Sequence, residues 1–417
     1  MYLDEIVSAQ KRGEAKGIPS ICSAHSWVLK AALLGKGPIL IESTCNQVNQ
    51  FGGYTGMNPG DFVRYVSEMA AENHYPLESI ILGGDHLGPN VWMNESSDKA
   101  MQKSEVMIRD YIQAGFIKIH IDCSMPLADD KESILPPEIS ARRTAQLAKV
   151  SEASHVEGLH LPRYIIGTEV PIPGGAQEHI PELRVTNVND TLQNIELIRK
   201  AFVHEGLESA WERVIAVVVQ PGVEFGDDFI LEYNPSLGSN LSRYIDSQPQ
   251  VFEVHSTDYQ KRDSLKNLVR DHFAILKVGP ALTFAFREAI FSLAWMEDEM
   301  YPKDKRSNLI QLIDDAMIRN PADWQKHYHG DSRQLAFARK FSLSDRIRYY
   351  WLYPQVQAAL NKLFNNLNGK PLPFSLLSQF MPRQYNHIRN GEILPSPKAV
   401  ILDHIQEVLQ DYQFACD

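Results

Sequence analysis

The sequence is poor in cysteine and has no long hydrophobic run. Four cysteines among 417 residues, with no CxxC pair, are too few for a disulfide framework and argue against a thiolate zinc ribbon. No apolar run approaches the roughly 20 residues of a membrane-spanning helix, and Met1–Gly17 lacks the apolar core of a secretory signal. We therefore expect a protein of the reducing cytoplasm that does not associate with membranes.

Positive charge is also scarce. The chain has 41 lysines and arginines against 52 aspartates and glutamates, so its formal net charge is −11. Nucleic acids and anionic membranes need a basic surface, so this balance argues against both, although a few local cations can still hold a small anionic substrate. No GxxxxGK[ST] loop is present and no GxGxxG follows a predicted strand. P-loop kinases and dinucleotide-dependent dehydrogenases therefore have no motif support.

What the sequence does contain is a regular alternation of short apolar runs and longer helical patterns. The predicted strands are Ile18–Cys22, Pro38–Glu42, Ser79–Gly84, Phe116–Asp122, Tyr164–Thr168, Val214–Val219, Val251–His255 and Ala274–Val278. The predicted helices between them include Ser26–Leu34, Asp61–Glu72, Asp98–Ala114, Glu138–Val150 and Asp190–Glu205. Eight alternations within about 280 residues favour a (β/α)₈ TIM barrel. A doubly wound open sheet is the alternative, because periodicity cannot distinguish closed strands from open ones.

The chain divides into two predicted parts. We expect the barrel to occupy residues 1–300, closed by a helix over Phe284–Met300, and residues 301–417 to form a helical extension packed on it. Within the extension, the segment Asp345–Trp351 (DRIRYYW) is dense in arginine and aromatic residues. We expect the extension as a whole to serve as a helical cap, a subunit interface or both.

Polar or ionisable residues end all eight predicted strands, and the chemistry of a TIM barrel takes place at these ends. The third strand runs into Asp85-His86, and we predict that His86 and His255 bind a metal with Glu169 as the third ligand. Two histidines and a carboxylate with one open position suit Zn²⁺, or alternatively Mn²⁺. The predicted proton-transfer residues are Asp85, Glu169 and Asp122.

Lys118, His120 and Asp122 alternate along one strand and therefore share a face, which we expect to line the barrel interior. We interpret Lys118 and His120 as an internal polar network and Asp122 as a site residue at its top. Carboxylates around Lys277 should keep it protonated, which favours an anion-binding or structural role over a Schiff base. The predicted substrate contacts are Glu42, Asn46, Gln220 and Lys277.

Several long segments resemble a known family. They are IESTCNQVNQFGGYTGMNPGDF (Ile41–Phe62), ILGGDHLGPNVW (Ile81–Trp92), IGTEVPIPGG (Ile166–Gly175), VVVQPGVEF (Val217–Phe225), EVHSTDYQ (Glu253–Gln260) and LKVGPALTFAFREAIF (Leu276–Phe291). Through them the chain closely resembles the GatZ/KbaZ family, the Z subunits of D-tagatose-1,6-bisphosphate aldolase. The resemblance implies a TIM barrel and a non-catalytic subunit that a separate class II aldolase Y subunit needs for full activity and stability. It also implies a role in the catabolism of galactitol, N-acetylgalactosamine or D-tagatose 6-phosphate.

The Asp85-His86 pair leaves an enzymatic alternative open. It is similar to the Asp-His pair of class II aldolases, in which the histidine binds Zn²⁺ and the aspartate handles the proton. A third histidine ligand is missing from the predicted strand ends unless His25 joins the site. Relatives of the family resemble ketohexose or ketohexose-phosphate 4-epimerases. The alternative is therefore metal-dependent 4-epimerisation of a ketohexose or its phosphate by retro-aldol chemistry, with Asp85 and Glu169 exchanging the protons. Self-association of the chain also stays open.

Overall fold

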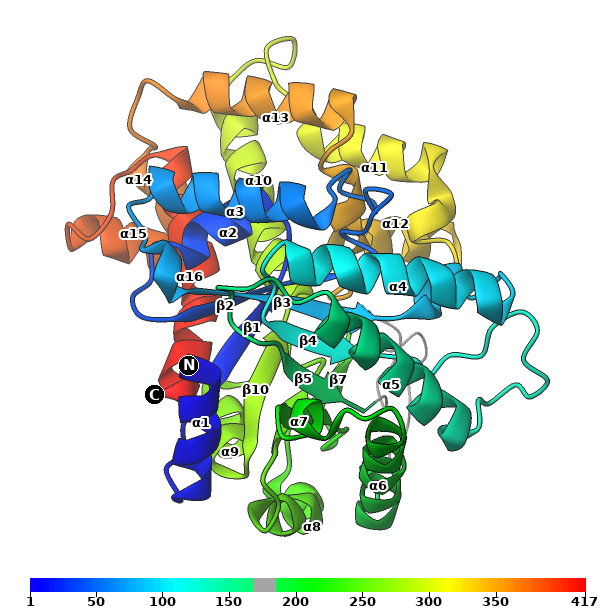
Figure 1. The fold of residues 1–417 in the computed structure, drawn as a ribbon. Helices are drawn as coiled ribbons and strands as arrows, with labels where there is room; N and C mark the ends of the chain where they lie inside the picture. The colour runs from blue at the N-terminus through cyan, green and yellow to red at the C-terminus, as the bar shows by residue number, and fades with distance from the viewer. Residues whose placement is uncertain (168–184) are drawn as a thin grey trace.

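The computed structural model describes residues 1–167 and 185–417 (Figure 1). Eight parallel strands close into a barrel in the order β1-β10-β9-β6-β5-β4-β3-β2, which confirms the predicted barrel and excludes the open sheet. The barrel strands are β1 (Ile18–Cys22), β2 (Ile39–Thr44), β3 (Ile80–Leu87), β4 (Lys118–Ile121), β5 (Arg163–Ile166), β6 (Val214–Val218), β9 (Val251–Val254) and β10 (Phe273–Val278). A short antiparallel pair, β7 (Glu224–Phe225) with β8 (Ile230–Leu231), was not predicted.

Helices follow the strands and surround the barrel (Figure 1). They are α2 (Ser26–Ala32), α3 (Pro59–Glu72), α4 (Ser97–Gln113), α5 (Pro137–Ala153), α6 (Val188–His204), α7 (Glu208–Trp211), α8 (Pro235–Asp246), α9 (Arg262–Arg270) and α10 (Pro280–Met300). Local sequence sets their starts: the Asn58 side chain accepts from the Asp61 backbone in a capping box, and Pro59 occupies the first turn of α3. No helix of the described residues is long and apolar enough to cross a membrane.

The N-terminal helix α1 (Tyr2–Lys11) closes the barrel at the end where the strands begin. Its buried Leu3 and Ile6 pack in one cluster with inward-facing residues of the strands, among them Ile18, Leu40 and Ile81. This apolar plug excludes water from one end of the barrel interior. Polar chemistry is thereby confined to the opposite end.

A buried ion-pair network fills the middle of the barrel. Lys118 Nζ lies 2.5 Å from Glu42 Oε1 and 2.7 Å from Glu253 Oε2, and all three side chains are fully buried. Gly83 leaves room for the network, since a Cβ at this position would lie 2.7 Å from Glu42 Oε1. The inward face predicted for Lys118 and His120 is thus confirmed, because alternate residues of a strand share one face.

The chain beyond Met300 is helical and returns to the barrel. Its elements are α11 (Leu309–Arg319), η3 (Pro321–Asp323), α12 (Ser332–Phe341), η4 (Arg346–Tyr350), α13 (Pro354–Leu367), α14 (Phe374–Phe380), α15 (Pro382–Arg389) and α16 (Pro397–Cys416). The last helix, α16, packs against β1, α2, α9 and α10. It ends beside the N-terminus, where the Gly17 backbone N–H donates to the Cys416 carbonyl at 3.0 Å (Figure 1).

Candidate metal centre

Three histidines and an aspartate from different strands converge at the mouth of the barrel. One ligand atom from each of Asp85, His86, His120 and His255 lies within 4.8 Å of the others, and all four side chains are buried. The ring centroid of His86 lies 4.9 Å from that of His120 and 4.9 Å from that of His255. Imidazole nitrogen and carboxylate oxygen are the donors that zinc sites use, so this buried cluster could hold a metal ion.

Each histidine of the cluster is oriented by an oxygen at one of its ring nitrogens. His86 Nδ1 lies 2.8 Å from Asp122 Oδ2, and His255 Nε2 lies 2.9 Å from Glu253 Oε1. His120 Nε2 lies 3.3 Å from the carbonyl oxygen of Gly167. Partners of this kind fix the tautomer and the ring orientation of metal-binding histidines. The other ring nitrogen of each histidine faces Asp85 or Lys277 inside the cluster. The donor set and its supporting oxygens therefore both fit a divalent metal.

Lysine 277 supplies the positive charge at the centre of the cluster. Its Nζ atom contacts Asp85 Oδ2 and lies 3.4 Å from His255 Nδ1. Burial opposes the charge on Asp85, but His86 and Lys277 outweigh it and hold the pKa of this carboxyl well below its usual range. Burial and the Lys277 ammonium together lower the pKa of His255, which keeps its imidazole neutral and free to bind a metal.

The structure places His120 in a buried polar network, as predicted, and also beside the other residues of the cluster. We interpreted this residue as part of an internal polar network and found no third histidine ligand in the sequence. His120 Nδ1 lies 2.9 Å from Asp85 Oδ1, inside the cluster, so three histidines could hold a metal here without His25. His25 stands apart as the residue before α2, where its ring packs on Phe286 with centroids 4.4 Å apart. Glu169, the predicted third ligand, lies outside the described residues.

The strand that carries Asp85 and His86 is longer than predicted. β3 continues past Gly84 to Leu87, and His86 adopts a left-handed backbone conformation with φ of 48°. Non-glycine residues rarely adopt this conformation, and such strain is concentrated at functional sites. Gly88 lies against the backbone just after β4. A Cβ at this position would lie 1.8 Å from the carbonyl oxygen of Asp122, so the close approach requires glycine.

The remaining predicted site residues are distributed over four environments. Asn46 and Lys277 line the pocket described below. Glu42 belongs to the ion-pair network of the barrel interior and contacts Lys118 instead of the pocket. Gln220 organises its own loop, because its side-chain oxygen accepts from the backbone N–H groups of Gly222 and Val223. Asp122 lies behind His86 and also accepts from Ser124.

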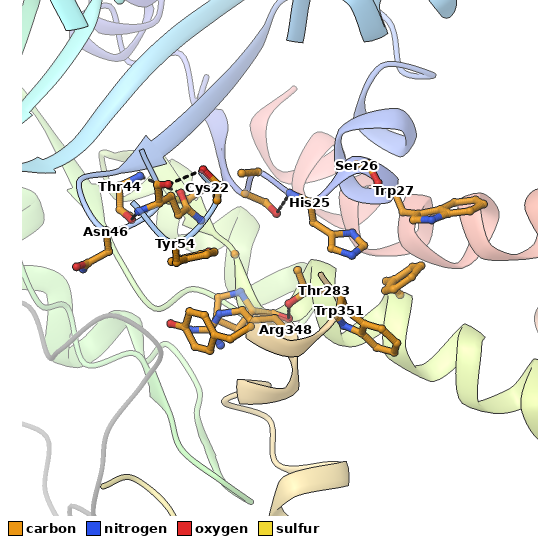
Figure 2. Close-up of a pocket in the computed structure, with 18 of the residues that line it drawn as sticks. Cys22, His25, Ser26, Trp27, Thr44, Asn46, Tyr54, Thr283, Arg348 and Trp351 are labelled. Carbon is orange, nitrogen blue, oxygen red and sulfur yellow. Dashed lines mark hydrogen bonds between the residues drawn. The ribbon is translucent and has the colours of Figure 1, made fainter. Parts of the chain in front are cut away.

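A cavity of about 230 Å³ opens above the cluster. His86, His255 and Lys277 form its floor, and the loop after β2 contributes Asn46 and Tyr54. The C-terminal extension supplies the opposite wall through Arg348, Tyr349 and Trp351, while Trp27 and Thr283 lie nearby (Figure 2). The barrel and the extension therefore build one pocket together.

The fold and this site define a (β/α)₈ barrel protein with a candidate divalent-metal centre at the carboxyl ends of its strands. Residues 3–417 match the family model described as D-tagatose-1,6-bisphosphate aldolase subunit GatZ/KbaZ-like. The chain belongs to this family, as its motifs predicted.

Relatives with this family name are similar in sequence over nearly the whole length of the chain. The D-tagatose-1,6-bisphosphate aldolase subunits GatZ of Salmonella heidelberg and Salmonella typhimurium are 50% and 49% identical, each over 99% of both chains. A crystal structure named as a probable tagatose 6 phosphate kinase from Sinorhizobium meliloti is 45% identical, with a TM-score of 0.90 over 96% of this chain and 100% of that one. This likeness confirms the TIM barrel with its C-terminal helices.

Proposed function

We propose that the chain binds a divalent ion, Zn²⁺ or Mn²⁺, on His86, His120 and His255, and uses it to act on a phosphorylated ketohexose. The observation that carries this proposal is the three-histidine cluster, of which His86 and His255 line a pocket. When bound, the metal would supply a Lewis acid for the sugar's carbonyl oxygen. A subunit with only a structural role would have no need for four buried ionisable groups that converge at the barrel mouth, since such groups cost stability.

The reaction that these residues suit is reversible aldol cleavage, with 4-epimerisation as its net outcome. In this reaction the Asp85 carboxylate would take the proton of the substrate's C4 hydroxyl. The C3–C4 bond then breaks, and its electron pair moves toward the C2 carbonyl, leaving an aldehyde at C4. Rotation of that aldehyde, re-formation of the bond and return of the proton from Asp85 give the epimer. Lys277 contacts Asp85 and would keep this carboxylate ionised before it takes the proton and after it returns it.

The test uses the purified chain alone with Zn²⁺ or Mn²⁺ and tagatose 6-phosphate, followed by NMR. We expect fructose 6-phosphate to appear, and to be lost in Asp85→Asn and His86→Ala. Metal content measured on the same samples should fall in His86→Ala and His120→Ala. Full metal occupancy in these variants would show that the ligand assignment is wrong.

A second function is favoured by the relatives, which are named as aldolase subunits. We propose on this ground that the chain also associates with a class II aldolase Y subunit in the cytoplasm and raises its activity and stability, within galactitol, N-acetylgalactosamine or tagatose 6-phosphate catabolism. Mixing the two proteins and measuring cleavage of tagatose 1,6-bisphosphate tests this role. Absence of turnover by the chain alone, together with activation of the Y subunit, would leave only the accessory function.

A further inference from the structure

The segment Asp345–Trp351 reaches the pocket, and its position is fixed by contacts with α10. Asp345 is buried at the start of η4, where it accepts a hydrogen bond from Thr283 at 2.5 Å and lies 3.6 Å from Arg287. At the other end of the segment, the Trp351 ring packs edge-on against Phe286, with centroids 5.1 Å apart. This part of the extension is therefore held rigidly against the barrel.

Arg348 lies between these two anchors and lines the pocket (Figure 2). Its Nη1 donates to the main-chain carbonyls of Ser344 and Asp345, and its Nη2 donates to the Tyr349 hydroxyl at 2.9 Å. A guanidinium has five N–H groups. Two of those of Arg348 have no acceptor among the residues that the structure describes.

The charge of Arg348 is also unbalanced. Lys277, the other cation lining the pocket, contacts Asp85. Within the described part of the chain, no carboxylate oxygen lies at ion-pair distance from Arg348, whose partners are two carbonyls and a phenol. The lining carboxylate of Asp258 is engaged elsewhere, because it accepts from the backbone N–H groups of Gly279 and Ala281. A half-buried cation with free donors and no counterion is a binding group for an anion.

We propose that Arg348 binds the phosphate group of the substrate and that the C-terminal extension thereby supplies the specificity of the site for phosphorylated sugars. This inference rests on the proposed function, which places a ketohexose phosphate in the pocket. The sugar's carbonyl end lies over the histidine cluster, and its phosphate end lies against η4. Tyr54 and Tyr349, whose rings meet edge to face with centroids 5.0 Å apart, form the wall next to the phosphate.

Binding measurements on the full chain test the proposal without depending on turnover. Trp27 and Trp351 line the pocket, so ligand binding can be followed by tryptophan fluorescence, with calorimetry as a second readout. The ligands are tagatose 6-phosphate, inorganic phosphate and unphosphorylated tagatose, each titrated with added Zn²⁺ and again with a chelator. The variants are Arg348→Met, Arg348→Lys and, as a matched control, Arg333→Met, which changes an exposed arginine in α12. Circular dichroism and thermal unfolding confirm that each variant is folded.

We expect Arg348→Met to weaken tagatose 6-phosphate binding about 100-fold, the loss expected for two charge-assisted hydrogen bonds. Arg348→Lys should lose about 10-fold, because it keeps the charge without the forked donors. Tagatose binding and the Arg333→Met control should stay unchanged. Equal losses for tagatose and tagatose 6-phosphate would show that Arg348 only shapes the pocket, and no loss for either would also overturn the proposal.

The failure of the proposed function has a different signature. If the unmodified chain binds tagatose 6-phosphate no more tightly than tagatose, the pocket does not recognise phosphate and both proposals are wrong. If the unmodified chain prefers the phosphorylated sugar and Arg348→Met retains that preference, only the role of Arg348 is wrong. Inorganic phosphate titrated in the presence of chelator separates anion binding by the protein from binding to a metal.

Discussion

Asp122 Oδ2 lies 2.8 Å from His86 Nδ1, although the two residues come from the ends of different strands, β4 and β3. Burial opposes the charge on Asp122, but the hydrogen bond from His86 outweighs it and holds the pKa of Asp122 below its usual range. The ionised carboxylate fixes the proton of His86 on Nδ1 and directs Nε2 toward the cluster, where it lies 3.7 Å from Asp85 Oδ2.

Replacing Asp122 should therefore weaken metal binding without removing a ligand. We expect Asp122→Asn to lower the affinity for Zn²⁺ by roughly 10–100-fold, because the amide cannot enforce the same tautomer of His86. Competition with a chromogenic chelator measures the change. Asp129→Asn is the matched control, since Asp129 is an exposed carboxylate that accepts hydrogen bonds from Ser97. An affinity equal to that of the unmodified chain would show that Asp122 does not orient His86.

Removing the Lys277 ammonium from the cluster should strengthen metal binding. Lys277 Nζ contacts Asp85 and approaches His255, so a divalent ion must displace it or compete with its charge. We expect Lys277→Met to bind Zn²⁺ or Mn²⁺ about 10-fold more tightly, because one unfavourable charge is lost from a buried site. Isothermal titration at pH 8 checks this result. Weaker binding in Lys277→Met would mean that the lysine supports the site instead of opposing the ion.

The ion-pair network inside the barrel is expected to be essential for folding. Lys118→Met leaves Glu42 and Glu253 buried without a cation, and breaking a buried pair in this way costs about 3–5 kcal/mol of unfolding free energy. Lys103→Met removes a partly exposed pair with Glu95 and should cost at most about 1 kcal/mol. Urea denaturation of both variants measures the difference. If both variants lose a similar amount of unfolding free energy, the interior network does not stabilise the fold more than a surface ion pair does.

Glu224 is expected to make stability depend on pH. Burial raises the pKa of this carboxyl from 4.5 to about 7. As pH rises from 4.5 to 7, the unfolded chain releases this proton first. The folded state then holds more protons than the unfolded state, and stability falls over that interval.

Glu224→Gln should remove this decline. We expect the variant to be about 2 kcal/mol more stable than the unmodified chain at pH 8 and nearly equal to it at pH 5, because a neutral amide has no charge to bury. Denaturant unfolding at the two pH values gives the comparison. If the variant and the unmodified chain differ in stability by the same amount at pH 5 and at pH 8, Glu224 does not titrate in this interval.

Much of the fold followed from patterns that act locally. Strand and helix periodicity identified the eight barrel strands, with β1 predicted at its observed bounds. Because alternate strand residues point the same way, Lys118 and His120 could be placed on the inward face from sequence alone. Asp85 and His86 could be placed at the mouth because the chemistry of this fold sits at strand ends. The β7–β8 pair escaped prediction, since two-residue strands carry no measurable periodicity.

The partners of these residues were decided only by the tertiary structure. His120 joins the metal-ligand cluster because strand register brings it beside Asp85, 35 residues earlier in the chain. Glu42 pairs with Lys118 for the same reason and is thereby withdrawn from the pocket. The role of Arg348 depends on the docking of η4 against α10 through Asp345, a contact that spans 62 residues. Sequence patterns fix which way a side chain points along its own element, but distances between elements arise only when the barrel closes and the extension packs on it.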